Sequence, residues 1–171
     1  RGKIVMSDFQ VINGMIGQQA IDNNSATQMH DLLHCVRAQD RATTDYGEGE
    51  FIYLLGLAAT AVGSVVRYSA VSGITKLAVA NDKGPIACAM AATVAGEYGW
   101  YQIFGVGVGK VKASFADDAN CYLTSTAGSL DDAVVAGDRV HNCIGGSAID
   151  TPSTGLALLE LNYPHTDDIA D

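Results

Sequence analysis

Short apolar runs without a helical period dominate the chain, and the clearest of them lies between residues 84 and 112. Within this run, Gly105, Gly107 and Gly109 fall on every second position, with valines between them. Alternation with a period of two is typical of a strand, because successive side chains point to opposite faces of a sheet. Glycine along one face predicts a strand that another backbone approaches closely. The segment is therefore expected at the centre of a compact β-domain.

The rest of the chain from residue 32 onward also predicts strands separated by turns. Such a series of short strands is typical of a sandwich or barrel and not of a βαβ fold. We expect an all-β fold, a single β-sandwich or jelly-roll-like domain over residues 32–164. One turn of helix is expected at Ser129–Ala136, where Asp131 and Asp132 follow a possible N-cap. The expected strands are Leu33–Ala38, Glu50–Leu57, Ser64–Ser69, Ile74–Ala80, Pro85–Ala91, Trp100–Val111, Ala119–Thr124, Arg139–Ile144 and Gly155–Asn162.

Residues 1–31 differ from the remainder of the chain, because they are polar with few apolar positions and no dominant period. They predict an extended N-terminal arm that borrows structure from a partner or from the core. A short helix over residues 25–34, with Ser25 as its N-cap, is the competing interpretation. Residues 165–171 are polar and acidic and predict a flexible tail. The arm's apolar residues, Val11, Ile12, Met15 and Ile16, are candidate contacts with a partner.

Composition limits the possible partners. The 171 residues suffice for one domain with a real core, and charged residues are 17% of the chain. The net charge of −9 argues against direct binding to nucleic acid or to an anionic membrane surface. No run approaches the ~20 apolar residues of a membrane helix.

The four cysteines, Cys35, Cys88, Cys121 and Cys143, form no Cys-x-x-Cys pair, and we expect reduced, buried thiols.

The segment from His30 to Cys35 is the one cluster that resembles a metal site. His30 and His34 would share a helix face, as in zinc proteases, but Asp31 replaces the Glu of the His-Glu-x-x-His motif, and no third ligand follows by spacing. The alternating glycines lack the helix that a nucleotide-binding loop requires. The two pairs of adjacent acids, Asp117-Asp118 and Asp131-Asp132, lack the alternation of a calcium loop. The sequence therefore predicts no catalytic residue, no cofactor and no metal.

Trp100 and Tyr101 are adjacent, so in a strand their rings point to opposite faces. One ring is expected in the core. The other, with Tyr98, is a candidate subunit contact, since Tyr and Trp are over-represented in interfaces.

An ordered set of segments resembles the small head decoration (cement) proteins of tailed bacteriophages. Each segment is short, and together they span about residues 32–164. The matching segments are Tyr46–Gly56, Thr60–Tyr68, Gly84–Ala92, Tyr98–Ile103, Asp138–Val140 and Thr151–Ala157.

The resemblance implies a virion protein without enzymatic activity. Such proteins are made in the host cytoplasm and bind the outer surface of the phage capsid between subunits of the major capsid protein, which they stabilise. The family has β-sandwich or jelly-roll folds and forms symmetric homo-oligomers, so a homodimer or a homotrimer is expected here. Two alternatives remain open at this stage. One is a carbohydrate- or receptor-binding β-module of the virion that uses Tyr46, Tyr98 and Trp100. The other is a small hydrolase that uses His30, Asp31 and His34.

Overall fold

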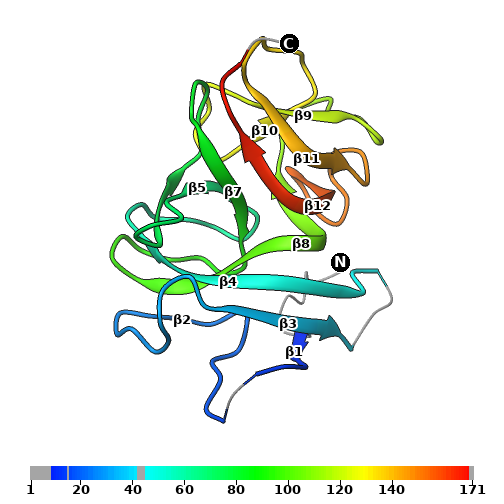
Figure 1. Cartoon of the computed structure of the whole chain (residues 1–171). Coiled ribbons are helices and arrows are strands. Elements are labelled where there is room, and N and C mark those ends of the chain that lie inside the picture. Colours follow the sequence, from blue (N-terminus) through cyan, green and yellow to red (C-terminus); the bar gives the residue numbers. More distant parts are fainter. Residues whose placement is uncertain (1–8, 15, 42–44, 170–171) are drawn as a thin grey trace.

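The computed structural model describes residues 9–14, 16–41 and 45–169, and every regular element in them is a strand (Figure 1). The all-β prediction is therefore confirmed. No helix in these ranges is long and apolar enough to cross a membrane. The strands are β1 (Phe9–Val11), β2 (Asn24–Ser25), β3 (Cys35–Asp40), β4 (Glu48–Gly56), β5 (Val65–Tyr68), β6 (Ile74–Leu77), β7 (Gly84–Ala89), β8 (Tyr98–Lys110), β9 (Asn120–Leu123), β10 (Leu130–Asp131), β11 (Arg139–Gly145) and β12 (Leu156–Thr166).

The strands form one sheet that folds over itself in a sandwich-like arrangement. The order along the sheet is β1-β3-β4-β6-β5-β7-β8-β12-β11-β9-β10, and β2 pairs separately with β8. A further pairing of β4 with β8 closes β4, β6, β5, β7 and β8 into a ring. Closure removes sheet edges, which would otherwise be open to pairing with other chains. Figure 1 shows β1 to β4 in the lower half of the molecule and β9 to β12 in the upper half.

Strand β8 joins the two halves because it is long and pairs on both sides. Its first half pairs with β4, from Leu55 opposite Tyr98 to Glu50 opposite Phe104. Its second half pairs with β12, from Phe104 to Lys110. The predicted close approach is found at Gly105, whose φ is +92° and where a Cβ would overlap the carbonyl oxygen of Glu48. At Gly107 the neighbours are instead side chains, with Gln102 Oε1 at 2.7 Å from the Cβ position.

The core consists of three adjoining clusters of buried side chains. The lower cluster gathers Phe9, Phe51, Tyr53 and Trp100. The middle cluster includes Tyr101 between β4 and β7, and the upper one lies among β5, β7, β9, β11 and β12. The apolar faces of the predicted strands therefore supply nearly all of the interior.

The predicted helix at Ser129–Ala136 is wrong. Residues 130–131 form β10, in which Leu130 pairs with Leu123 and is buried in the upper cluster. Its burial requires an extended backbone, and the two aspartates that favoured a helix instead accept hydrogen bonds from loop amides. The alternative helix over residues 25–34 is also absent, because bends and turns follow β2, although the Ser25 hydroxyl accepts a bond from the amide of Thr27 as an N-cap would.

The cysteines are free, as expected, but they are not all buried. Cys88, Cys121 and Cys143 lie together in the upper cluster, whereas Cys35 is exposed on β3. Burial raises the pKa of Cys88 to about 12, and Cys121 adds to this shift. The pKa of Cys143 is raised by its hydrogen bond to Cys121 and by burial.

Candidate functional site

The first part of the predicted arm is added to the sheet as an edge strand. Strand β1 pairs antiparallel with β3, and the Phe9 ring packs edge-on against Phe51 at 5.0 Å. The next residues continue the attachment, since the amide of Ile12 donates to the Arg37 carbonyl and the Asn13 side chain accepts from the Arg37 amide. The N-terminal segment thus borrows structure from the core.

The apolar residues of this segment divide between the core and the surface. Val11 packs against the lower cluster. Ile12 is 47% exposed, and Ile16 is fully exposed in a turn beyond the edge strand. Met15 lies outside the described residues. Ile12 and Ile16 are therefore the predicted contact residues that remain available to a partner.

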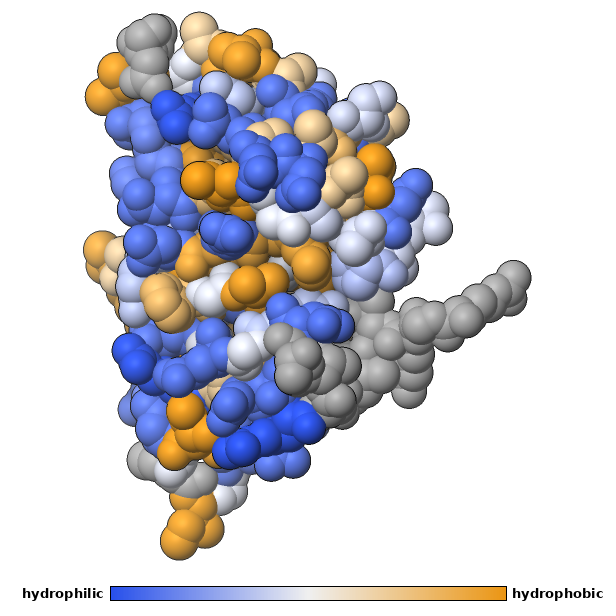
Figure 2. Space-filling model, turned by 90° about the vertical axis from the view of Figure 1, so that its right-hand side faces the viewer, coloured by the Kyte–Doolittle hydropathy of each residue, from blue (hydrophilic) through white to orange (hydrophobic). Residues whose placement is uncertain are grey.

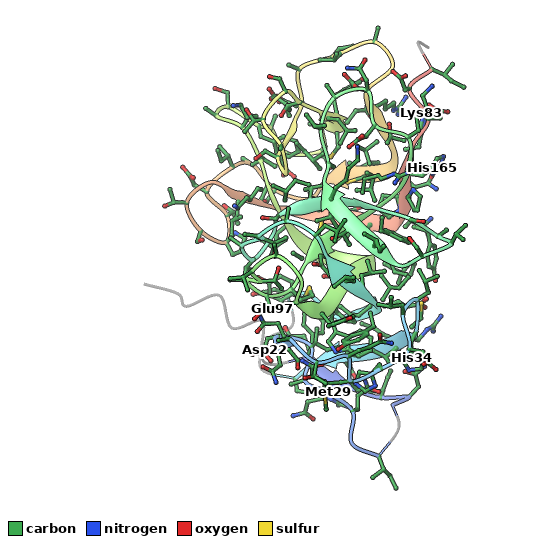
Figure 3. The ribbon with its side chains drawn as sticks, turned by 90° about the vertical axis from the view of Figure 1, so that its left-hand side faces the viewer. Asp22, Met29, His34, Lys83, Glu97 and His165 are labelled. Atoms are coloured by element: carbon green, nitrogen blue, oxygen red, sulfur yellow. The ribbon has the colours of Figure 1, made fainter. Side chains whose placement is uncertain are left out.

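The second part of the arm is tied down independently of the first. Ile21 is buried in the lower cluster, and β2 pairs with the start of β8. The Asn24 side chain donates to the Ala92 carbonyl at 3.0 Å and also to Glu97. Figure 3 shows Asp22, Met29, His34 and Glu97 at one end of the molecule, far from Lys83 and His165. Residues 19–25 therefore belong to the folded domain.

His30 and His34 lie in a turn against the lower core cluster. Residues 30–34 form a turn, so the two side chains do not share a helix face. Their rings stack, with the ring centroids 6.1 Å apart. His30 also packs on Tyr53 and Trp100, and its Nε2 accepts a hydrogen bond from the amide of Gln19. Among the described residues no three His, Cys, Asp or Glu side chains converge as metal ligands. The pair holds the arm against the core.

The environment of His30 favours its neutral form. Burial lowers its pKa, the neighbouring His34 lowers it further, and Asp31 opposes both effects. A neutral imidazole also keeps the lone pair that accepts from Gln19.

The three aromatic residues of the start of β8 are not equivalent. Trp100 and Tyr101 point to opposite faces as expected, but both are only 1% exposed, in the lower and middle clusters. The expectation that one of these two rings faces a partner is therefore wrong for this fold. The closed ring of strands encloses Tyr101, and Phe9 and Ile21 of the N-terminal segment help to cover the face that carries Trp100. Tyr98 is half-buried and stacks on Tyr53. Tyr46 is also half-buried, beside Phe9.

The predicted acidic tail begins later than expected. Strand β12 continues to Thr166, which is buried. The next two acids are paired, Asp167 with His141 and Asp168 with Lys83.

Sequence reasoning missed one feature, a groove over β8, β11 and β12. Phe104, Asn142 and Glu160 are among its lining residues. The sequence signal near it is Gly105, which the alternating pattern assigned to close packing of two strands and not to a groove. Compared with protein-family models, curated protein sequences and solved structures, the chain matches none.

Proposed function

We propose that the chain is a decoration (cement) protein that binds the outer surface of a phage capsid between major capsid subunits and stabilises the shell. The resemblance of residues 32–164 to that family motivates the proposal. The observation that supports it is the attached N-terminal segment, which leaves Ile12 and Ile16 exposed next to an edge strand. An apolar side chain beside a sheet edge offers a partner both surface to bury and backbone groups to pair with.

A binding role fits the described residues better than the hydrolase alternative. His30 is committed to the Gln19 amide and to aromatic packing, so it has no free nitrogen lone pair for proton transfer. The carbohydrate module on Tyr46, Tyr98 and Trp100 is not favoured either, since Trp100 is buried.

The test is co-sedimentation with purified phage heads stripped of accessory proteins, with bound copies counted against the major capsid protein. The chain is expected to saturate at a fixed ratio to capsid subunits. The double variant I12D/I16D should bind at least a hundredfold more weakly, because burial of each isoleucine contributes about 1.5–3 kcal/mol. Point substitutions are preferable to deletion, because Phe9 and Ile21 belong to the core.

The matched control is V134D, which places the same charge on a loop residue that is 79% exposed and distant in sequence. It should bind like the unchanged chain. If the unchanged chain shows no saturable binding to the heads, the cement role is contradicted. Equal binding of the double variant would remove Ile12 and Ile16 from the contact.

A further inference from the structure

A groove of about 640 Å³ lies on the outer face formed by β8, β12 and β11. In Figure 1 the bend of β8 and the end of β11 lie at the right-hand edge of the molecule. Figure 2 views that side and shows apolar surface gathered near its middle, bordered by hydrophilic surface above and below. The volume falls in the range of small-molecule sites, about 300–1,000 Å³.

The groove exists because three neighbouring strands leave regular geometry at the same level. Gly105 on β8, Asn142 on β11 and Tyr163 on β12 all have positive φ, at +92°, +60° and +53°. In the pairing of β8 with β12, Gly105 lies opposite Leu161. In the pairing of β11 with β12, the register shifts around Asn142. A positive φ is uncommon for a tyrosine, and such backbone conformations cluster at binding sites. Bulges of this kind re-aim side chains out of the sheet.

Aromatic rings border one end of the groove. Phe104 lines it and is 36% exposed, and the Tyr163 ring stands 5.6 Å away, 48% exposed and tilted by 32°. The Tyr163 hydroxyl donates to the Glu50 carboxylate, which also pairs with Arg37. Burial and the Glu50 charge raise the pKa of Tyr163, so the hydroxyl keeps its proton. The ring position is therefore fixed before any ligand arrives.

Polar side chains with hydrogen-bonding capacity lie along the floor. Glu160 stands between Val106 on β8 and Ile144 on β11, and Asn162 lies opposite Phe104. Within the described part of the chain, no hydrogen bond or ion pair engages the side chains of Glu160, Asn162 or Asn142. The groove therefore presents two amides and a carboxylate close to exposed rings.

We propose that this groove binds a neutral saccharide. A sugar ring has an apolar face of C–H groups, which suits the Phe104 ring, and hydroxyls at its rim, which suit amide and carboxylate oxygens. The lining holds one carboxylate, Glu160, and one guanidinium, Arg139, so the groove carries no excess charge of either sign and suits a neutral ligand. The site differs from the buried Trp100 region and does not depend on the cement role.

The groove is suited to binding and not to hydrolysis of its ligand. Glycosidases place two carboxyl groups about 5–9.5 Å apart across the scissile bond. Among the residues that line the groove, Glu160 is the only carboxylate.

The test uses the full chain with maltotriose, cellotriose and tri-N-acetylchitotriose as probes, by saturation-transfer NMR and isothermal titration. At least one probe is expected to bind without being cleaved. F104A and E160Q should each weaken that binding at least tenfold. D118N, which changes an exposed loop carboxylate outside the groove, should leave it unchanged.

Circular dichroism and thermal unfolding establish that each variant is folded, and E160Q removes only a charge at an exposed position. The proposal is overturned if no probe binds at 10-millimolar concentration, or if binding survives both groove variants. It is also overturned if sedimentation velocity shows a dimer that I144D converts to a monomer, since the groove would then be a subunit contact. Binding of E160Q to phage heads should be unaffected, so this test and that of the cement role fail independently.

Discussion

Replacement of Gly105 by alanine tests the central element of the fold, the close approach of β4 to β8. A Cβ at Gly105 would overlap the Glu48 carbonyl, and the residue's φ is +92°. Because the overlapping atom belongs to a paired backbone, it cannot move away as a side chain could. We expect the β4–β8 pairing to loosen locally.

The expected loss is the sum of two costs less one gain. The left-handed conformation costs an alanine about 1–2 kcal/mol. Overpacking against fixed atoms adds about 1–3 kcal/mol. The lower entropy of the unfolded alanine chain returns about 0.4–1 kcal/mol. The free energy of unfolding of G105A should therefore fall by about 3 kcal/mol.

Alanine variants of two other glycines separate the cost of the left-handed conformation from the cost of overpacking. Gly155 has a φ of +75° but nothing within 4 Å of its Cβ position, so G155A should lose only about 1 kcal/mol. Gly107 has ordinary φ, and its nearest neighbours are the side chains of Gln102 and Leu161. G107A should cost less than G105A, since those side chains can move.

Urea unfolding monitored by the fluorescence of Trp100, the single and buried tryptophan, provides the measurement. With a slope of about 2 kcal/mol per molar urea, the midpoint should fall by about 1.5 M for G105A and about 0.5 M for G155A. If the two variants unfold within about 0.3 M of each other, contact with the Glu48 carbonyl has no energetic weight and the reasoning is refuted.

Two further predictions concern ionisable groups. The pKa of His30 is lowered in the folded chain, so the unfolded chain binds more protons as the pH falls below about 6.5, and the free energy of unfolding should drop. H30Q should flatten that part of a plot of unfolding midpoint against pH. An unchanged slope in H30Q would contradict the environment assigned to His30. A thiol-specific reagent should modify Cys35 alone in the native chain and all four cysteines after unfolding, because Cys88, Cys121 and Cys143 are buried. Burial also raises the pKa of Cys88 and of Cys143. Rapid native modification of more than one thiol would show that the upper cluster opens.

The strand positions could be predicted from the sequence because each strand carries its own signal. Period-two alternation and Gly-rich turns are local, so β4, β7, β8 and β11 lie within a few residues of their expected ranges. The pairing of β4 with β8 and the addition of β1 to β3 join segments far apart in the chain, and no local pattern specifies them. The helix predicted at Ser129–Ala136 failed for the same reason, since the burial of Leu130 depends on β9.

The groove could not be predicted, because its cause is a coincidence in space. Gly105, Asn142 and Tyr163 each break the regularity of one strand, and none of them alone indicates a groove in the sequence. Only the register of β8, β12 and β11 brings the three irregularities to one level. A tyrosine keeps a strained backbone conformation only where contacts with its surroundings hold it there. The hydrogen bond from Tyr163 to Glu50 and the ion pair of Glu50 with Arg37 provide such contacts across β12, β4 and β3. A variant that breaks this chain of contacts should therefore disturb the groove while leaving the edge strand β1, and with it Ile12, attached to β3.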